Sequence, residues 1–167
     1  LYDRNEYVVF SVMLLSTLDK DGPYFDYLRT NFADDQDFMN FVSNIKARSI
    51  YDFNGIDVNA DDELLILSTC TAPSNAHFNN GRCAVVARKV RDGETIAIRN
   101  SDIVKNNDAI MPYAWYINQK KTPHKFYTDP NYKIPGVSTI SVTQALPDTS
   151  KNSDPTSRII NENSADS

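Results

Sequence analysis

The sequence predicts a mostly β domain in which one amphipathic helix forms a crossover between strands. Five or six short runs are rich in Val, Ile, Leu and aromatic residues and are separated by turn-forming residues, which is typical of strands. One segment alone, about Asp35–Ala47, spaces its apolar residues as a helix does. This combination favours a barrel or a rolled sheet that carries the helix in a crossover.

Composition limits what the chain can be. Its 167 residues are enough for one domain of ordinary size, and 41% apolar residues allow a packed core. The formal net charge of −5, without a long basic run, argues against nucleic acid as a partner. No apolar run approaches the roughly 18 residues that a membrane-spanning helix needs. Two cysteines allow one disulfide at most, which is too few for a disulfide scaffold.

The first predicted strand is Glu6–Leu15, which is dense in β-branched and aromatic residues and starts without a helix cap. A turn follows at residues 19–23, where Gly and Pro are adjacent. Tyr24–Phe32 has weak helical spacing, and we expect one short helix or an ordered loop there.

The helix is predicted from its cap and from its apolar spacing. Asp34 and Asp35 offer an N-cap, and apolar residues follow at i, i+3, i+4 and i+7. These residues are Phe38, Phe41, Val42 and Ile45. Acidic residues fall in the first turn, and Lys46 and Arg48 in the last, which suits the helix dipole. We expect the apolar face to pack on a sheet.

Strand-like runs continue after the helix. Ser49–Asn59 alternates around apolar residues and contains an Asn-Gly turn. Leu64–Leu67 and Ala84–Ala87 are apolar runs joined by a long polar loop, which predicts a pair of strands. Thr95–Arg99, after a turn, is expected to add a last short strand.

Beyond residue 100 the pattern weakens. Met111–Tyr116 and Phe126–Tyr127 are aromatic clusters that we expect to pack against the domain, and Val137–Val142 has an extended pattern. After Pro147 the chain has almost no apolar residues, which is typical of disorder. We therefore divide the chain into a domain over 1–100, an aromatic-containing extension over 101–146 and a disordered tail over 147–167.

Cys70 closes the first of the paired runs and Arg82 opens the second, so pairing of the strands would bring a thiol and a guanidinium together. A cysteine acts as a nucleophile in its thiolate form, which a positive neighbour favours. Acyl transfer also needs donors for an oxyanion, and Arg82 and the N–H of Thr71 could supply them. The alternative is that Cys70 is an inert, small apolar residue at a strand end.

Other groupings of cysteine and histidine are weaker. Alternation points Cys83 away from Cys70 and Arg82, which predicts a core residue and argues against a Cys70–Cys83 disulfide. No C-x₂₋₄-C or H-x₃₋₅-H spacing supports a zinc site. The eleven residues between Cys70 and Arg82 exclude a Cys-x₅-Arg phosphate loop. His77 and His124 lie in polar surroundings and are expected to be solvated. We predict no metal and no cofactor.

The run Leu67-Ser68-Thr69-Cys70-Thr71, followed by a loop, by Arg82 and by the apolar run Cys83–Ala87, resembles the sortases, and most closely the class B type. The resemblance extends upstream through Tyr7–Val12 and through the helix with Arg48-Ser49-Ile50-Tyr51, and it covers about Tyr2 to Arg91. Met111-Pro112 and Trp115-Tyr116 resemble a C-terminal extension of some class B-like members.

The resemblance implies a closed β-barrel, here its C-terminal part, and a cysteine transpeptidase. Such an enzyme cleaves a sorting-signal peptide of a surface protein, holds it as a thioacyl intermediate and transfers it to an amine of a cell-wall peptide or a pilin. By this resemblance Cys70 is the nucleophile, and Arg82 holds the peptide and stabilises the oxyanion. Thr71 is a candidate oxyanion donor, while Ser68 and Thr69 line the strand end.

The family's histidine, the general acid for the leaving amine, lies upstream of the cysteine, but no histidine precedes Cys70 in this chain. We therefore expect the C-terminal part of a sortase domain that is inactive alone. An absent N-terminal segment is expected to anchor the parent protein at the extracellular face of a Gram-positive cell membrane. The chain starts without Met or a signal peptide, as a fragment would. Two alternatives remain: a catalytically inactive remnant that binds a peptide or a partner, and a plain β-rich interaction domain.

Overall fold

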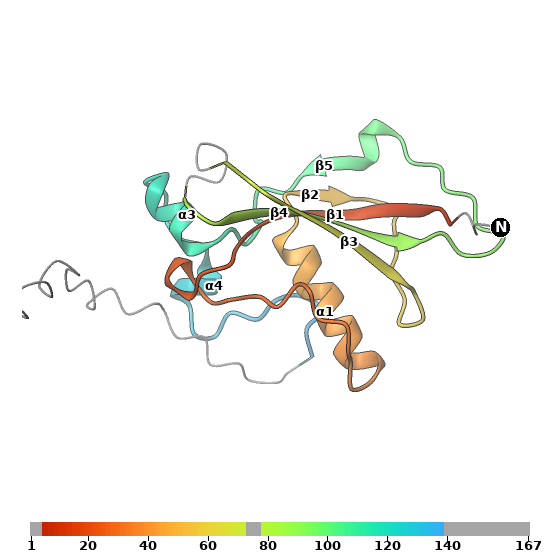
Figure 1. The fold of residues 1–167 in the computed structure, drawn as a ribbon, viewed down its shortest axis with the longest axis horizontal. Coiled ribbons are helices and arrows are strands. Elements are labelled where there is room, and N and C mark those ends of the chain that lie inside the picture. The colour runs from red at the N-terminus through yellow and green to blue at the C-terminus, as the bar shows by residue number, and fades with distance from the viewer. Residues whose placement is uncertain (1–4, 73–77, 139–167) are drawn as a thin grey trace, which may run out of the picture.

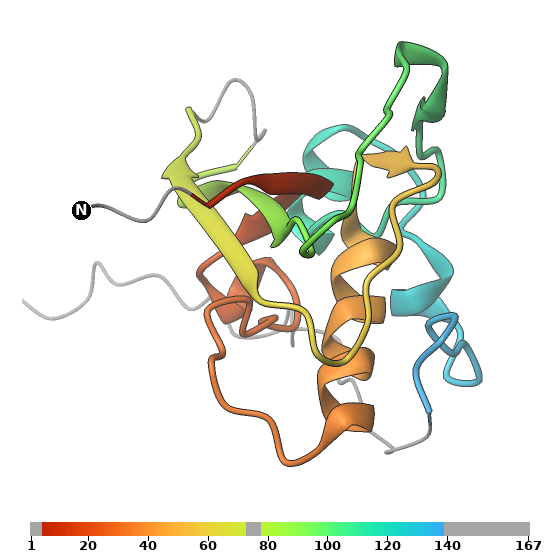
Figure 2. The ribbon, with the colours of Figure 1, turned by 90° about the vertical axis from the view of Figure 1, so that its right-hand side faces the viewer.

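The computed structural model describes residues 5–72 and 78–138 and arranges them in three layers (Figure 1, Figure 2). One layer is an antiparallel sheet of β1 (Tyr7–Ser16), β4 (Gly81–Lys89) and β3 (Leu64–Cys70), with β4 in the centre. The helix α1 (Asp35–Arg48) forms the middle layer. Residues 106–138, which we call the strap, begin at the C-terminal end of α1, and their later part (residues 125–138) lies on the far side of α1.

The three strands form where β-branched residues and Leu are dense, as predicted. The register between β1 and β4 shifts once, just after Val9, which marks a β-bulge. Because a bulge changes which residues face one side of a sheet, Val8 and Phe10, the extra residue of the bulge, share the core with Met13 and Leu15 after it. Strict alternation would have placed these two pairs on opposite faces.

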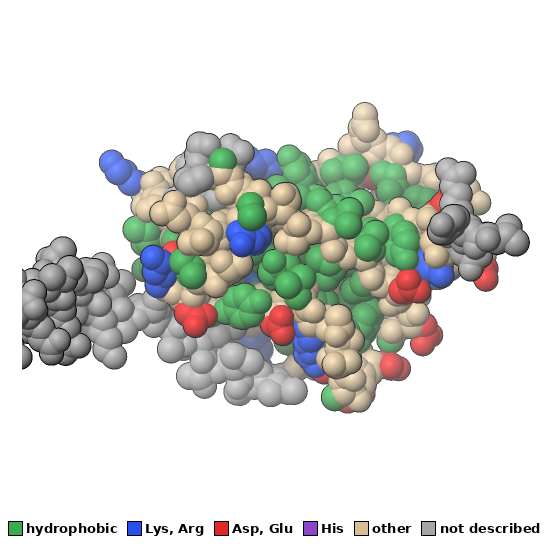
Figure 3. All heavy atoms as spheres, in the orientation of Figure 1, with side chains coloured by type: hydrophobic (Ala, Val, Ile, Leu, Met, Phe, Trp, Pro, Cys, Tyr) green, Lys and Arg blue, Asp and Glu red, His purple; other side chains and the backbone are tan. Residues whose placement is uncertain are grey.

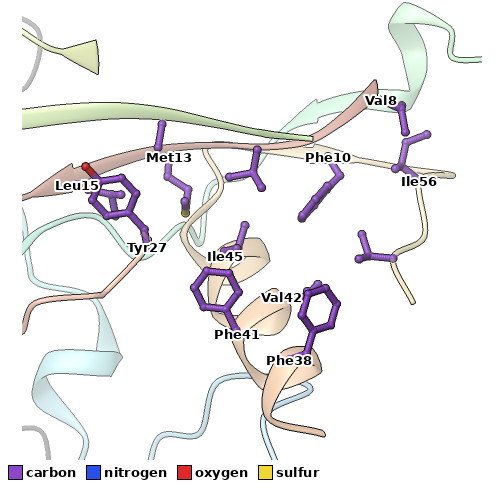
Figure 4. Close-up of a cluster of buried hydrophobic side chains, with 13 residues drawn as sticks. Val8, Phe10, Met13, Leu15, Tyr27, Phe38, Phe41, Val42, Ile45 and Ile56 are labelled. Carbon is purple, nitrogen blue, oxygen red and sulfur yellow. The ribbon is translucent and has the colours of Figure 1, made fainter. Parts of the chain in front are cut away.

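The core lies between this sheet and α1, and Figure 4 shows the side chains of the helix pointing toward β1. The helix begins at the N-cap Asp34, whose carboxylate accepts a hydrogen bond from the N–H of Asp37 at 2.8 Å. The predicted helix is confirmed and ends one residue later than predicted, at Arg48. Its buried apolar residues are the predicted ones: Phe38, Phe41, Val42 and Ile45. Burying an apolar side chain of this size stabilises the fold by about 1.5–3 kcal/mol.

Residues 17–34, which we call the crossover loop, connect β1 to α1. A single 3₁₀ turn at Asp19–Asp21 is the only helical element in it. Tyr24–Phe32 is an ordered loop, so of the two predicted forms the short helix is wrong. Contacts between aromatic rings hold the loop against α1. The ring centres of Phe25 and Phe41 are 5.6 Å apart, and those of Phe32 and Phe38 are 5.1 Å apart.

A second, smaller sheet pairs β2 (Tyr51–Phe53) with β5 (Ile103–Lys105). Of the strand-like run Ser49–Asn59, only Tyr51–Phe53 forms a strand. The predicted strand at Thr95–Arg99 is wrong. A strand needs a partner for its backbone groups, and the chain pairs with β2 only after a 3₁₀ turn at Asn100–Asp102.

The strap runs along α1 from the C-terminal end of the helix back to its N-terminal half. The N–H of Ile110 donates to the carbonyl of Ala47 at 2.9 Å, near the end of α1. The N–H of Ser138 donates to the side chain of Asn40 at 2.9 Å, near its start. The strap therefore covers the face of α1 that the sheet leaves open.

Two short helices carry all the aromatic residues of the strap except Tyr132: α3 (Tyr113–Asn118) and α4 (Lys125–Thr128). Phe126 is buried with Ile110 and Ile134 in a second apolar cluster, against which Ala47 of α1 packs. The prediction that the aromatic clusters pack against the domain is confirmed for these residues.

The described residues are mostly β with one long helix, as predicted, but they contain no strand that joins β1 to β3 into a closed barrel. Leu67 on the open edge strand β3 is 59% exposed, and Figure 3 shows hydrophobic side chains gathered over this part of the molecule. No helix within the described ranges has the length and apolarity needed to cross a membrane. Most of Val137–Val142 and the whole 147–167 tail lie outside the described residues, and the division into 1–100, 101–146 and 147–167 stays a prediction.

Candidate active site at the end of the three-stranded sheet

Cys70 and Arg82 lie directly opposite each other in the register of β3 and β4. Residues in this relation project to the same face of a sheet, with their Cβ atoms about 4.5–5.5 Å apart. The N–H of Thr71 donates to the carbonyl of Gly81 at 3.0 Å. Hydrogen-bonded and non-hydrogen-bonded pairs alternate, so Cys70 and Arg82 form a non-hydrogen-bonded pair, the kind whose side chains are closer. The strands pair as predicted and bring thiol and guanidinium to one end of the sheet.

This pair lies on the face of the sheet that α1 covers farther along. Ala84 and Val86, which follow Arg82 on the same face of β4, are fully buried. On its other side Arg82 is opposite Leu15 of β1, which is also buried. Arg82 itself is half-buried and Cys70 is exposed. The pair therefore lies where the core meets solvent, and a ligand can reach the thiol.

The charge of Arg82 is not neutralised by a carboxylate within the part of the chain that the structure describes. Its guanidinium donates to the carbonyl of Gly81 at 3.1 Å and forms no ion pair there. Arg88, on the same face of the same strand, differs: it donates to both carboxylate oxygens of Glu94, at 2.7 and 2.5 Å. These bonds lower the pKa of Glu94 to about 2. Of the two arginines, Arg82 is the one whose charge is available to an anionic group on a ligand.

Ser68 and Thr69, which are predicted to line the strand end, lie on opposite faces of β3. Ser68 shares the face of Cys70, whereas Thr69 is opposite Cys83 on the other face. The Oγ atom of Ser68 is 3.1 Å from the hydroxyl oxygen of Tyr27, a buried residue of the crossover loop. Tyr27 is not among the predicted site residues, because a weakly amphipathic run does not reveal which strand it contacts.

Thr71 is already engaged in the structure. The carbonyl of Gly81 accepts from the N–H of Thr71 and also from the guanidinium of Arg82. An oxyanion at this place would therefore compete with one carbonyl for both of its predicted donors. The roles of Cys70, Arg82 and Thr71 in chemistry stay predictions.

Cys83 is half-buried on the far face of the sheet, rather than within the core that α1 covers, and it forms no disulfide with Cys70. Within residues 5–72 and 78–138, no group of three or more His, Cys, Asp or Glu side chains could hold a metal ion. His77 lies outside the described residues.

The prediction that His124 is solvated is wrong. Its side chain is 6% exposed, its Nδ1 accepts a hydrogen bond from the N–H of Phe126 at 2.9 Å, and its Nε2 is 3.2 Å from a carboxylate oxygen of Asp108. Burial lowers the pKa of His124 below the ordinary 6.5. The residue is the N-cap of α4, and its position directly before a short aromatic helix is the only sequence signal for that role.

Sortase B of Staphylococcus aureus is 29% identical to this chain over 89 residues, which are 53% of this chain and 32% of the relative. About half of this chain is class B sortase-like. The resemblance predicted from the Cys–Arg stretch is thereby confirmed. The chain spans about a third of the length of this curated relative. No family model matches the chain.

Solved structures of sortase B also match the sortase-like chain over about half its length. That of Clostridium perfringens is 26% identical, with 53% of this chain and 44% of that chain covered and a TM-score of 0.45. That of S. aureus is 29% identical, with 52% of this chain and 37% of that chain covered and a TM-score of 0.41. A sortase B complexed with triglycine is 31% identical, with 54% of this chain and 38% of that chain covered and a TM-score of 0.41.

Proposed function

We propose that this chain is part of a class B-like sortase, a cysteine transpeptidase that attaches surface proteins to a cell-wall or pilin amine. The observation that carries the proposal is the direct opposition of Cys70 and Arg82 at the solvent-facing end of the sheet. The absence of a carboxylate partner for Arg82 in the described residues adds to it. The sequence match to sortase B supports the class of chemistry.

In the proposed reaction the thiolate of Cys70 attacks the carbonyl carbon of a peptide bond in the sorting signal. Arg82 and backbone N–H groups stabilise the oxyanion of the tetrahedral intermediate. The C–N bond then breaks, the leaving amine takes a proton from a general acid, and a thioester remains on Cys70. An acceptor amine attacks the thioester, loses a proton, and releases the thiol of Cys70.

This reaction needs a general acid that residues before Cys70 do not supply, because both histidines of the chain follow it. His124 is buried and caps α4, so it is not assigned this role. We propose that the family's histidine comes from residues outside this sequence. The same part of the protein would extend the sheet along the open edge of β3, since Ser49 and Ile50 already bridge the outer edge of β1, and would anchor the protein at the extracellular face of a Gram-positive cell membrane.

The second candidate function is a sortase-like remnant that binds a peptide or a partner without turning it over. One observation favours it: the N–H of Thr71 is hydrogen-bonded to the carbonyl of Gly81 instead of pointing to an open oxyanion site.

The test uses the protein that the complete reading frame encodes, a library of peptides based on C-terminal sorting signals, and triglycine as the amine. Mass spectrometry measures peptide cleavage, transfer to triglycine and the acyl adduct on Cys70. We expect Cys70→Ala to abolish cleavage and transfer. Arg82→Lys should lower transfer about 10²-fold, because the charge stays but the planar fork is lost. The control Arg99→Lys changes an arginine whose side chain is 82% exposed and should have no effect.

Transfer that survives Cys70→Ala would rule out Cys70 as the nucleophile. Peptide binding without cleavage by the wild-type protein would favour the remnant. A protein that neither binds nor cleaves any of the peptides would favour the third hypothesis, a plain β-rich interaction domain.

A further inference from the structure

The strap and the crossover loop meet at Arg48, the last residue of α1. Arg48 is buried, with 7% of its surface exposed. Its guanidinium lies 4.4 Å from the ring centre of Phe25 in the crossover loop and 5.2 Å from that of Phe126 in the strap. Its hydrogen bonds go to Asn44 in the previous turn of α1, and it has no carboxylate partner among the described residues. Arg48 thus joins loop and strap through cation–π stacking.

A second junction lies at Gly22, in the turn that follows β1. Its φ of 127° is a conformation that side chains rarely adopt. A Cβ atom at this position would lie 3.1 Å from the Cβ of Tyr113 and 3.2 Å from its backbone nitrogen. The start of α3 therefore packs directly on the backbone of the crossover loop, and the contact depends on glycine.

Between the two junctions is a cavity of about 20 Å³, which is bounded by β1, the crossover loop, Arg48 and the strap. Leu15 lines this cavity and is also the β1 residue opposite Arg82. The junction of loop and strap is therefore one side chain away from Arg82 across the sheet.

The crossover loop also contacts β3 and the residue directly before β4, the two strands that carry the Cys70–Arg82 pair. Tyr27 contacts Ser68 of β3, on the face of Cys70, with 3.1 Å between their hydroxyl oxygens. The hydroxyl of Thr17 donates to the carbonyl of Asn80 at 3.4 Å, one residue before β4 begins. The backbone hydrogen bonds within the loop close only local turns, so the position of the loop relative to the strands depends on such side-chain anchors.

We propose that Arg48 and Gly22 are positioning residues for the Cys70–Arg82 site, through which the strap holds the crossover loop against β3 and β4. The catalytic meaning of this arrangement rests on the proposed function, whereas the contacts themselves do not. In this chain of contacts, Phe126 and Tyr113 of the strap hold the crossover loop at Arg48 and Gly22. Tyr27 of the loop in turn contacts β3 beside the site.

The first test is Arg48→Met, which keeps the length of the side chain and removes its charge. The measured quantities are the rate at which Cys70 reacts with a bulky maleimide and the amide hydrogen exchange of residues 17–34. All variants carry Cys83→Ser, so that only one thiol reacts. We expect faster exchange in the crossover loop and a rate at Cys70 that rises at least about twofold, the lower end for coupling through packed side chains. Exchange in β1 and β4 should stay unchanged.

Arg99→Met is the matched control, because its side chain is 82% exposed and lies far from the junction in sequence. It should change neither the Cys70 rate nor the exchange of residues 17–34. An Arg48→Met protein with the wild-type Cys70 rate and wild-type loop exchange would overturn the proposal.

Gly22→Ala against Gly55→Ala keeps the proposal testable if Arg48→Met does not fold. Both glycines have positive φ, 127° and 88°, so both substitutions strain the backbone. Only the new Cβ at Gly22 meets a neighbour, since nothing lies within 4 Å of the one at Gly55. We expect the Cys70 rate to change in Gly22→Ala alone, and equal rates in the two variants would refute the role of this junction. Because these readouts do not involve peptide transfer, they can fail or succeed independently of the proposed transpeptidase activity.

Discussion

Arg88→Met and Arg82→Met remove a charge from the same face of the same strand, and we expect different losses of stability. Arg88 is 1% exposed, donates to both carboxylate oxygens of Glu94 and donates to the main-chain oxygen of Asp57 at 2.7 Å. Losing the hydrogen bonds of a buried charged donor costs about 1.5–3 kcal/mol, even though the carboxylate of Glu94 keeps the N–H of Arg91 as a donor. For a chain of this size that loss lowers Tm by roughly 3–12 °C.

Arg82 donates to a single carbonyl and has no carboxylate partner in the described residues. Its removal should cost about 1 kcal/mol or less, the contribution of one hydrogen bond. Thermal unfolding at neutral pH, followed by circular dichroism, measures both variants against Arg99→Met, an exposed arginine whose loss should cost under about 1 kcal/mol. Equal losses for Arg82→Met and Arg88→Met would refute the conclusion that the charge of Arg82 is left for a ligand.

Acid titration adds a second measurement to this comparison. The pKa of Glu94 falls from 4.5 to about 2 in the folded protein, chiefly through its bonds with Arg88. A lowered folded-state pKa gives a contribution that is complete above the unfolded value and is lost as the pH falls. The stability difference between the wild-type protein and Arg88→Met should therefore narrow as the pH falls from 4.5 towards 2.

Substitutions at three further positions test the helix, the core and the strap by urea unfolding. Asp34→Ala removes the N-cap of α1 and should cost about 1 kcal/mol, whereas Asp34→Asn keeps a capping oxygen and should cost much less. Ile45→Ala empties a fully buried site and should cost about 2–5 kcal/mol; a loss under about 1 kcal/mol would contradict the packed core between α1 and the sheet. Burial lowers the pKa of His124 below 6.5. The contribution of the neutral imidazole to the free energy of unfolding is therefore complete above pH 6.5 and is lost as the pH falls below it. His124→Asn retains an N-cap acceptor without titrating, so its stability should fall less between neutral and acidic pH than that of the wild type, and equal slopes would speak against a buried neutral imidazole.

Sequence reasoning succeeded where the controlling interactions are local. Asp34 caps its own helix, and Phe38, Phe41 and Ile45 share a face because of the helical period alone. The Cys70–Arg82 pairing was also within reach, since two neighbouring apolar runs joined by a polar loop form antiparallel strands.

The features that escaped prediction depend on contacts between distant segments. Thr95–Arg99 alternates like a strand, yet only Ile103–Lys105 finds a partner, in β2. Tyr27 reaches Ser68 across 41 positions of the chain. The burial of His124 depends on Asp108 and on the cap of α4 as well as on its own neighbours. The apolar periodicity of a single segment does not predict such contacts with distant segments.

The path of the strap along α1 determines how the protein would respond to tension on its C-terminal side. The contact nearest that end, between Ser138 and Asn40, lies about two helical turns from the one between Ile110 and Ala47. A pulling force therefore peels the strap away contact by contact before any load reaches the sheet. Such a load would disconnect Phe126 from Arg48 early and leave the strand register that pairs Cys70 with Arg82 until last.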